Sequence, residues 1–159
     1  MSASQVHYKS NKDLIATYGP LVIWIDAGVT EGRSESLHRI AQLFAGALAN
    51  EPSVSLLMVM QEGSRLPDGD TRESAAKLFN ELGDRFKGLN VVLLGGGFWA
   101  SALRSAITGI GLMLRQRASV RVFTALDSAA EHVAEQLGKF EAGALQSTCE
   151  DLRSQLQQG

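Results

Sequence analysis

The chain has 159 residues, of which 45% are hydrophobic and 20% charged, and its formal net charge is −2. This length suits one domain that buries its own core without disulfide or metal cross-links. Fifteen basic residues against seventeen acidic ones leave no strongly basic surface, which argues against a nucleic-acid partner. The single cysteine, Cys149, has no second cysteine to pair with. This pattern indicates a reducing, cytoplasmic compartment.

We expect neither export nor a membrane span. Residues 1–6 lack the basic and apolar stretches of a secretion signal. No apolar run approaches the roughly 20 residues that cross a bilayer as a helix.

Short apolar runs predict the strands. Four such runs end at polar or glycine-rich turns, at residues 21–25, 54–60, 91–94 and 120–123. Their continuous hydrophobicity is typical of strands that helices cover on both faces. Ahead of them, residues 6–18 predict one or two edge strands joined by a turn at residues 11–13.

Segments with helical periodicity separate these runs. The stripes comprise Leu37, Ile40, Phe44 and Leu48, then Ala75, Leu78, Phe79, Leu82 and Phe86, then Ala130, Val133, Ala134 and Leu137. Asp70 with Glu73 resembles a capping box, and Thr124 or Asp127 could cap the third helix. Residues 98–116 are apolar around much of a helix, which indicates deep burial or pairing with something outside the domain.

Strands and helices alternate from about residue 21 to residue 137, which predicts a mainly parallel sheet with right-handed crossovers. We therefore predict an α/β fold with a mixed four- to five-stranded sheet, flanking helices and antiparallel N-terminal strands at one edge. Residues 1–138 would form this domain, and residues 139–159 an extra amphipathic helix packed on the domain or on a partner. The predicted core comprises Phe44, Leu57, Phe79, Phe86, Val92 and Leu94.

A glycine-rich turn is the most distinctive local motif. Residues 95–100 satisfy the pattern G-x-G-x-x-A after a strand and before a helix, where helix N–H groups could bind a phosphate. The structural alternative is a tight turn that needs glycine. The motif follows a late strand, and no acidic residue lies about 20 positions on to hold a ribose, which favours the structural alternative. One turn later, Arg104 could reach an anionic ligand or a partner carboxylate, or extend into solvent.

Catalytic and metal-binding signatures are weak. The histidines His7, His38 and His132 are far apart in sequence, whereas a metal site needs three or four converging ligands. No serine occupies a G-x-S-x-G turn. Asp26, Glu62 and Asp68 fall near strand ends and could act as acid and base, but a turn or capping role explains Asp68 without chemistry. We expect no enzyme activity, no cofactor and no metal.

Two local patterns carry a family resemblance. Residues 97–105 open a helix after a strand, and residues 120–130 lead from a strand into a capped helix. With the order of elements, they resemble the STAS and SpoIIAA-like group, the anti-sigma-factor-antagonist fold, over roughly residues 14–137. The phosphorylated Asp-Ser-Ser/Thr-Gly stretch of partner-switching members is missing from the corresponding loop, residues 61–71. Ser64 and Thr71 are the nearest hydroxyl groups there.

The resemblance implies a bacterial, non-enzymatic protein–protein interaction module in signalling, either an adaptor or an antagonist that masks a partner. The alternative is a domain that binds a small ligand, either a nucleotide or a lipid. The candidate residues for binding a ligand or partner are Ser64, Arg65, Asp68, Gly96, Phe98, Trp99 and Arg104. We also predict self-association as a homodimer. Either the C-terminal helix covers the apolar helix at residues 98–116 within one chain, or both helices contribute to a two-fold interface.

Overall fold

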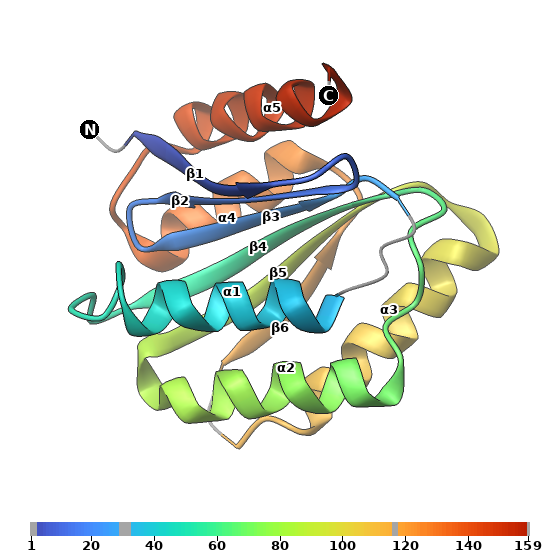
Figure 1. Cartoon of the computed structure of the whole chain (residues 1–159), viewed down its shortest axis with the longest axis horizontal. Helices are drawn as coiled ribbons and strands as arrows, with labels where there is room; N and C mark the ends of the chain where they lie inside the picture. Colours follow the sequence, from blue (N-terminus) through green and yellow to red (C-terminus); the bar gives the residue numbers. More distant parts are fainter. Residues whose placement is uncertain (1–2, 29–32, 116–117, 159) are drawn as a thin grey trace.

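The computed structural model describes residues 3–28, 33–115 and 118–158. Within these ranges, six strands form one sheet in sequential order (Figure 1). They are β1 (Ser4–Lys9), β2 (Asp13–Tyr18), β3 (Leu21–Asp26), β4 (Val54–Gln61), β5 (Phe86–Leu94) and β6 (Ser119–Phe123). β1, β2 and β3 are antiparallel neighbours, whereas β3 to β6 run parallel. The predicted mixed α/β fold is confirmed, but both N-terminal segments pair, so the sheet has six strands rather than four or five.

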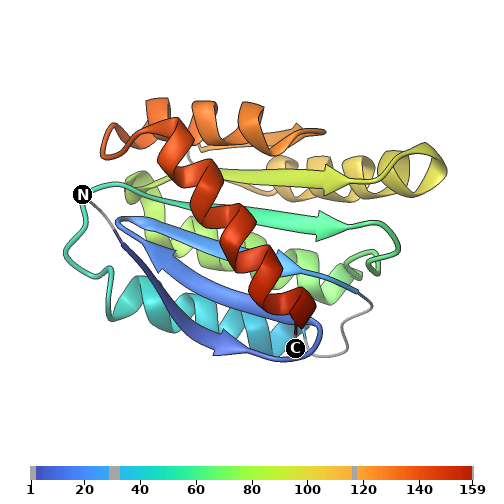
Figure 2. The same cartoon turned by 90° about the horizontal axis from the view of Figure 1, so that it is seen from above.

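Helices cover both faces of this sheet. On one face lie α1 (Arg33–Ala45), α2 (Gly69–Leu82) and α3 (Gly97–Leu112), and on the other lie α4 (Leu126–Leu137) and α5 (Ala142–Gln158) (Figures 1 and 2). Right-handed crossovers between strands that advance in one direction place α1, α2 and α3 on the same face. The side chains of β4 alternate accordingly: Leu56 and Met58 pack towards α1–α3, and Leu57 packs towards α4 and α5.

The structure corrects the predicted boundary between the second helix and the strand that follows it. Gly83, with φ of 62°, ends α2, and a short 3-10 turn, η1 (Gly83–Arg85), leads directly into β5 at Phe86. Phe86 thus begins the strand rather than ending the helix, although its spacing from Leu82 fits a helical stripe. Its ring still stacks on that of Phe79, with centroids 4.2 Å apart. The strand therefore starts five residues before the predicted run at Val91.

Burial matches the predicted core at all but one position. Phe44, Leu57, Phe79, Phe86 and Val92 are buried. Leu94 is half-buried because it is the last residue of β5, and the residues after it leave the core.

The capping role that the sequence suggested for Asp68 is confirmed, whereas the expected caps at Asp70 and at the start of α4 are not. Asp68 caps α2, since its Oδ1 accepts a hydrogen bond from the backbone N–H of Thr71 at 2.8 Å, and Asp70 already lies in the first turn. This hydrogen bond lowers the pKa of the Asp68 carboxyl. α4 begins after Ala125 and has no side-chain cap. The Asp127 carboxylate instead accepts from the N–H of Ser128, inside the first turn.

α5 crosses the sheet on the side away from α3 (Figure 2). Its stripe of Leu145, Cys149, Leu152 and Leu156 packs against β2, β3 and α4 and is at most 3% exposed. The C-terminal helix therefore does not cover α3. α3 buries one stripe, ends at Leu112, and leaves Phe98 and Leu112 exposed, while Gln116 lies outside the described residues. No helix within the described ranges is long and apolar enough to span a bilayer.

Candidate functional site

Two features stand out near the carboxyl ends of the parallel strands: a buried charged network beside a cavity, and an exposed aromatic surface. The network begins at the end of β3. The Arg33 guanidinium donates from Nη2 to Asp26 Oδ2 at 2.7 Å, and both side chains are almost fully buried. Burial raises the pKa of the Asp26 carboxyl, and the hydrogen bond from Arg33 opposes part of that increase.

Asp13 extends the network across β2. Its Oδ2 accepts from the indole N–H of Trp24 at 3.2 Å and from the Ser36 hydroxyl at 2.7 Å, while its Oδ1 accepts from Ser10 at 2.8 Å. These bonds tie β2 and β3 to the first turns of α1. With this many partners, the Asp13 carboxylate serves to join elements rather than to meet a substrate.

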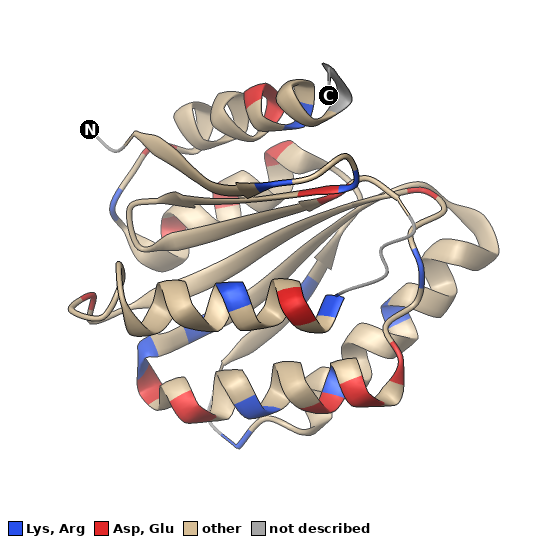
Figure 3. Cartoon of the chain, viewed as in Figure 1, with Lys and Arg blue, Asp and Glu red and all other residues tan. Residues whose placement is uncertain are grey.

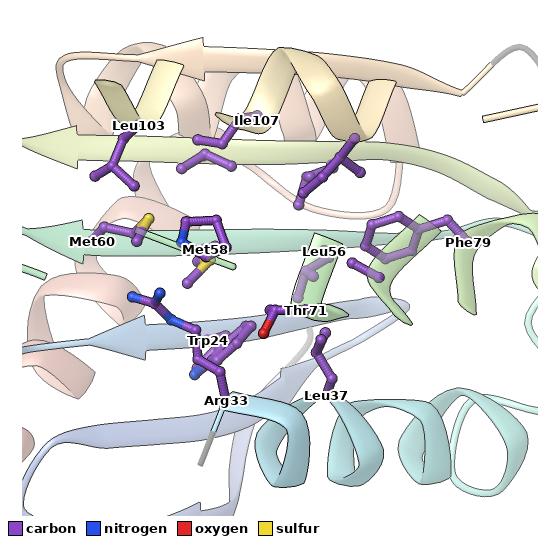
Figure 4. Close-up of a pocket in the computed structure, with 15 residues that line it drawn as sticks. Trp24, Arg33, Leu37, Leu56, Met58, Met60, Thr71, Phe79, Leu103 and Ile107 are labelled. Carbon is purple, nitrogen blue, oxygen red and sulfur yellow. The ribbon is translucent and has the colours of Figure 1, made fainter. Parts of the chain in front are cut away.

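A cavity of about 50 Å³ lies beside this network, between the sheet and α1–α3. Its wall is mostly apolar and includes Trp24, Met58, Met60 and Leu103, and Arg33 also lines it (Figure 4). None of the seven candidate residues predicted from the sequence lines this cavity.

Sequence reasoning does not single out Arg33, although a signal for it exists. α1 begins at Arg33, and a positive charge at a helix N-terminus opposes the helix dipole. A cation in that position indicates a specific anionic partner. The preceding strand-end carboxylate in the sequence is Asp26.

The structure brings three of the predicted candidates to one place. The indole N–H of Trp99 donates to the backbone carbonyl of Ser64 at 2.8 Å, which ties the loop after β4 to the first turn of α3. Gly96 is the N-terminal capping residue of the same helix. Ser64 is 2% exposed, so its hydroxyl lies inside the protein rather than on the surface.

The other four candidates lie on the surface. Phe98 is 89% exposed and sits next to Trp99 on α3. Arg65 and Arg104 are exposed, and Asp68 is exposed at the start of α2. Leu66, which was not among the candidates, is 45% exposed in the loop that Trp99 anchors.

The glycine turn has a structural explanation at two of its three positions. A Cβ on Gly95 would lie 2.7 Å from Glu62 Cβ and 2.8 Å from Trp99 Cζ3, so a side chain cannot fit there. Gly97 has φ of 66°, a conformation that favours glycine. Gly96 has neither constraint. The turn therefore serves to pack α3 closely against the loop after β4.

This explanation gives a testable difference between two neighbouring glycines. We expect Gly97→Ala to lower the free energy of unfolding by about 1–2 kcal/mol, because alanine is strained at positive φ. Gly96→Ser is the control and should be neutral or slightly stabilising, because serine is a favourable N-cap. Urea denaturation measures both variants, and equal costs at the two positions would contradict the explanation.

Cys149 and two of the three strand-end carboxylates considered as acid or base are buried or already hydrogen-bonded. Burial raises the pKa of the Cys149 thiol to about 12, so this sulfur is not a nucleophile at neutral pH. Asp26 is fully buried, and Asp68 caps a helix. Among the residues that the structure describes, no three histidine, cysteine or carboxylate side chains gather as a metal site would require.

The described part of the chain is thus a three-layered α/β protein. No family model matches its sequence, and no curated protein does. The structure is similar to that of an uncharacterized protein of the DUF3478 family from Shewanella loihica, which has a SpoIIAA-like fold. The two are 16% identical with a TM-score of 0.46, and the match covers 83% of this chain and 94% of that one.

Proposed function

We propose that this chain is a non-enzymatic protein–protein interaction module of cytoplasmic signalling, which binds its partner through the exposed side of α3 and the adjoining loop. The observation that carries the proposal is the 89% exposure of Phe98. Burying an exposed phenylalanine ring against a partner lowers the free energy of the complex. Aromatic residues and arginine are also typical of binding hot spots. The buried state of Cys149 and Asp26 supports a non-enzymatic role.

The composition of α3 is more typical of a surface that contacts another protein than of one that stays exposed to water. Its 16 residues include one charged side chain, Arg104, whereas α1 and α2 each carry charged residues of both signs (Figure 3). Apart from Arg104, the exposed positions between Phe98 and Leu112 are hydroxyl-bearing: Ser101, Ser105 and Thr108. Small side chains let the backbone of another chain approach closely. α3 carries no carboxylate that would hinder this approach.

The same surface supports a homodimer through α3 alone, because the stripe of α5 that the sequence prediction assigned to a two-fold interface is buried against its own domain. Phe98 and Leu112 are 14 residues apart, or about 21 Å along the helix, and lie within about 40° of one another around it. If α3 packed antiparallel on its copy about a two-fold axis, Phe98 of one chain would meet Leu112 of the other. Such a contact is self-complementary, as a two-fold interface requires.

Phe98→Asp tests both parts of this proposal. An aspartate in the first turn favours the helix, so the variant should remain folded while it loses the apolar contact. We expect light scattering at high micromolar concentration to give a dimer for the unmodified protein and a monomer for this variant. Affinity capture from the native cell, read by mass spectrometry, should likewise lose its specific partner.

Val6→Ser is the matched control, because Val6 is 39% exposed on β1, at the opposite edge of the sheet. It should retain both the dimer and the captured partner. A monomer at every concentration would rule out the dimer. If Phe98→Asp and the unmodified protein captured the same partners, the proposed surface would be wrong.

A further inference from the structure

The two edges of the sheet differ in how well they are protected against an added strand. β1 forms one edge and β6 the other. The pairing of β1 with β2 shifts its register between Val6 and Tyr8, and β1 is mostly polar and ends at Lys9. Bulges and lysine side chains are among the features that keep the edge strands of natural proteins from pairing. β1 is therefore a protected edge.

β6 has none of these features. Its five residues pair in parallel with Gly88–Val92 of β5 without a register shift. β6 contains no proline and no lysine, and its apolar side chains are half-buried. Within the described residues, no strand pairs with β6 on the side away from β5. Its outer edge thus leaves backbone N–H and C=O groups without a strand partner.

The side chains of β6 alternate between the two faces of the sheet. Val120 and Val122 pack towards α1–α3, and Phe123 packs towards α4 and α5. Arg121 shares the face of Phe123, and it is exposed. In the described part of the chain it forms no ion pair, although α4 on that face carries the exposed Glu135. An added strand would therefore place apolar side chains beside the two valines and a polar one opposite Arg121.

Charge decides which polar side chain fits there. Residues 85–126, which include β5, α3 and β6, contain six lysine and arginine residues and no aspartate or glutamate. All seventeen acidic residues of the chain lie outside this segment. Lys87 in β5 and Arg115 ahead of β6 are exposed, as Arg121 is. This charge pattern attracts an acidic segment to the edge of the sheet and repels a basic one.

A second copy of the chain is a poor occupant of this edge. If two β6 strands paired antiparallel over their full length about a two-fold axis, Arg121, the middle residue, would lie opposite the partner's Arg121. Like charges directly opposite one another destabilise a strand pair, whereas opposite charges stabilise it. A carboxylate from a different protein removes this repulsion.

We propose that the outer edge of β6 binds an extended acidic segment of a partner protein, which adds to the sheet as a further strand. Its apolar side chains lie beside Val120 and Val122, and a carboxylate lies opposite Arg121. Apolar surface continues from this edge onto α3, because a Cβ on Gly111 would lie 3.4 Å from Val120 Cγ2, and the next residue, Leu112, is 85% exposed. The inference goes beyond the surface proposed above, since it uses the main chain of β6 and does not need Phe98.

The test uses the full chain, labelled with ¹⁵N, and the synthetic peptide acetyl-Thr-Val-Glu-Val-Thr-amide. The peptide reads the same in both directions, so parallel and antiparallel addition give the same side-chain pattern. We expect saturable shifts of the amide signals of Val120, Arg121 and Val122, and slower hydrogen exchange at the β6 amides that face outwards. The matched peptide with lysine in place of glutamate should bind about fivefold more weakly.

Exchanging the charge on the protein separates a specific strand pair from general attraction. Arg121→Glu should reverse the preference, so that the lysine peptide binds more tightly than the glutamate peptide. Lys9→Glu is the matched control, because Lys9 is an exposed residue of the other edge strand. It should leave the preference unchanged. Phe98→Asp should also retain peptide binding, so a failure of the α3 surface and a failure of this edge are distinguished.

The same signals report a different binding mode or a different occupant. Strand addition depends on main-chain hydrogen bonds, so either N-methylation of both valines or N-methylation of the other three residues should abolish binding. Retention in both cases, or equal binding of the glutamate and lysine peptides, would overturn the proposal. Protection of β6 amides that rises with protein concentration, without peptide, would show that a second copy occupies the edge. Shifts at β6 with a short oligothymidylate but none with the glutamate peptide would indicate a nucleic acid instead.

Discussion

Removing α5 by truncation after Gly138 should leave a chain that aggregates or fails to fold. Leu145, Leu152 and Leu156 are at most 3% exposed, and burying a leucine side chain contributes about 1.5–3 kcal/mol. The three together contribute about 5–9 kcal/mol, which is comparable to the whole stability of an ordinary domain, about 5–15 kcal/mol. Truncation would also expose the apolar surface of β2, β3 and α4 that α5 covers. Light scattering and circular dichroism measure the outcome.

A point substitution gives the matched comparison for the truncation. Leu152→Ala should cost about 2–5 kcal/mol, whereas Ser154→Ala, one of the exposed positions of α5, should change the stability by less than about 0.5 kcal/mol. If the truncated chain remained monomeric and as stable as the full chain, α5 would be free to bind a partner instead. The packing role described above would then be wrong.

The order of elements could be predicted because β3 to β6 are apolar runs with helical segments between them. β1 could not be predicted as firmly, because nearly all of its residues are exposed and polar, and its pairing depends on β2 beside it. The start of β5 was missed for a related reason. Lys87, Gly88 and Asn90 interrupt the apolar pattern, although the backbone continues the ladder with β4.

The two candidate sites differ in how much of them the sequence carries. Phe98 and Trp99 could be singled out because they follow three glycines and open an apolar helix. The cavity has no such signal, since it arises where side chains from three strands and three helices leave space unfilled. A volume mismatch of that kind depends on how the elements pack. The Arg33–Asp26 pair is partly predictable from the sequence. A cation in the first turn of a helix is unfavourable with respect to the helix dipole, so its presence there indicates a specific anionic partner.

Phe79→Ala should lower the free energy of unfolding by about 3–5 kcal/mol, the cost typical of removing a buried aromatic ring. Phe79 is 1% exposed, and its ring lies parallel to that of Phe86, with 5° between the planes. Phe86 in turn meets Phe44 edge to face, with centroids 6.4 Å apart. The substitution would remove the ring that joins α2 to this aromatic cluster, and it would enlarge the cavity that Phe79 lines.

Phe98→Ala removes the same side chain from the surface and isolates the effect of burial. Phe98 is 89% exposed in the single chain, so its loss should change the stability of the monomer, measured at low concentration, by less than about 0.5 kcal/mol. Guanidinium denaturation measures both variants, and an unchanged slope with denaturant would show that a shift in midpoint reports stability. A cost below about 1 kcal/mol for Phe79→Ala would mean that the ring is not packed in the core. A cost similar to that of Phe79→Ala for Phe98→Ala would mean that Phe98 is already buried in the protein in solution, as in a dimer through α3, and dilution would then reduce that cost.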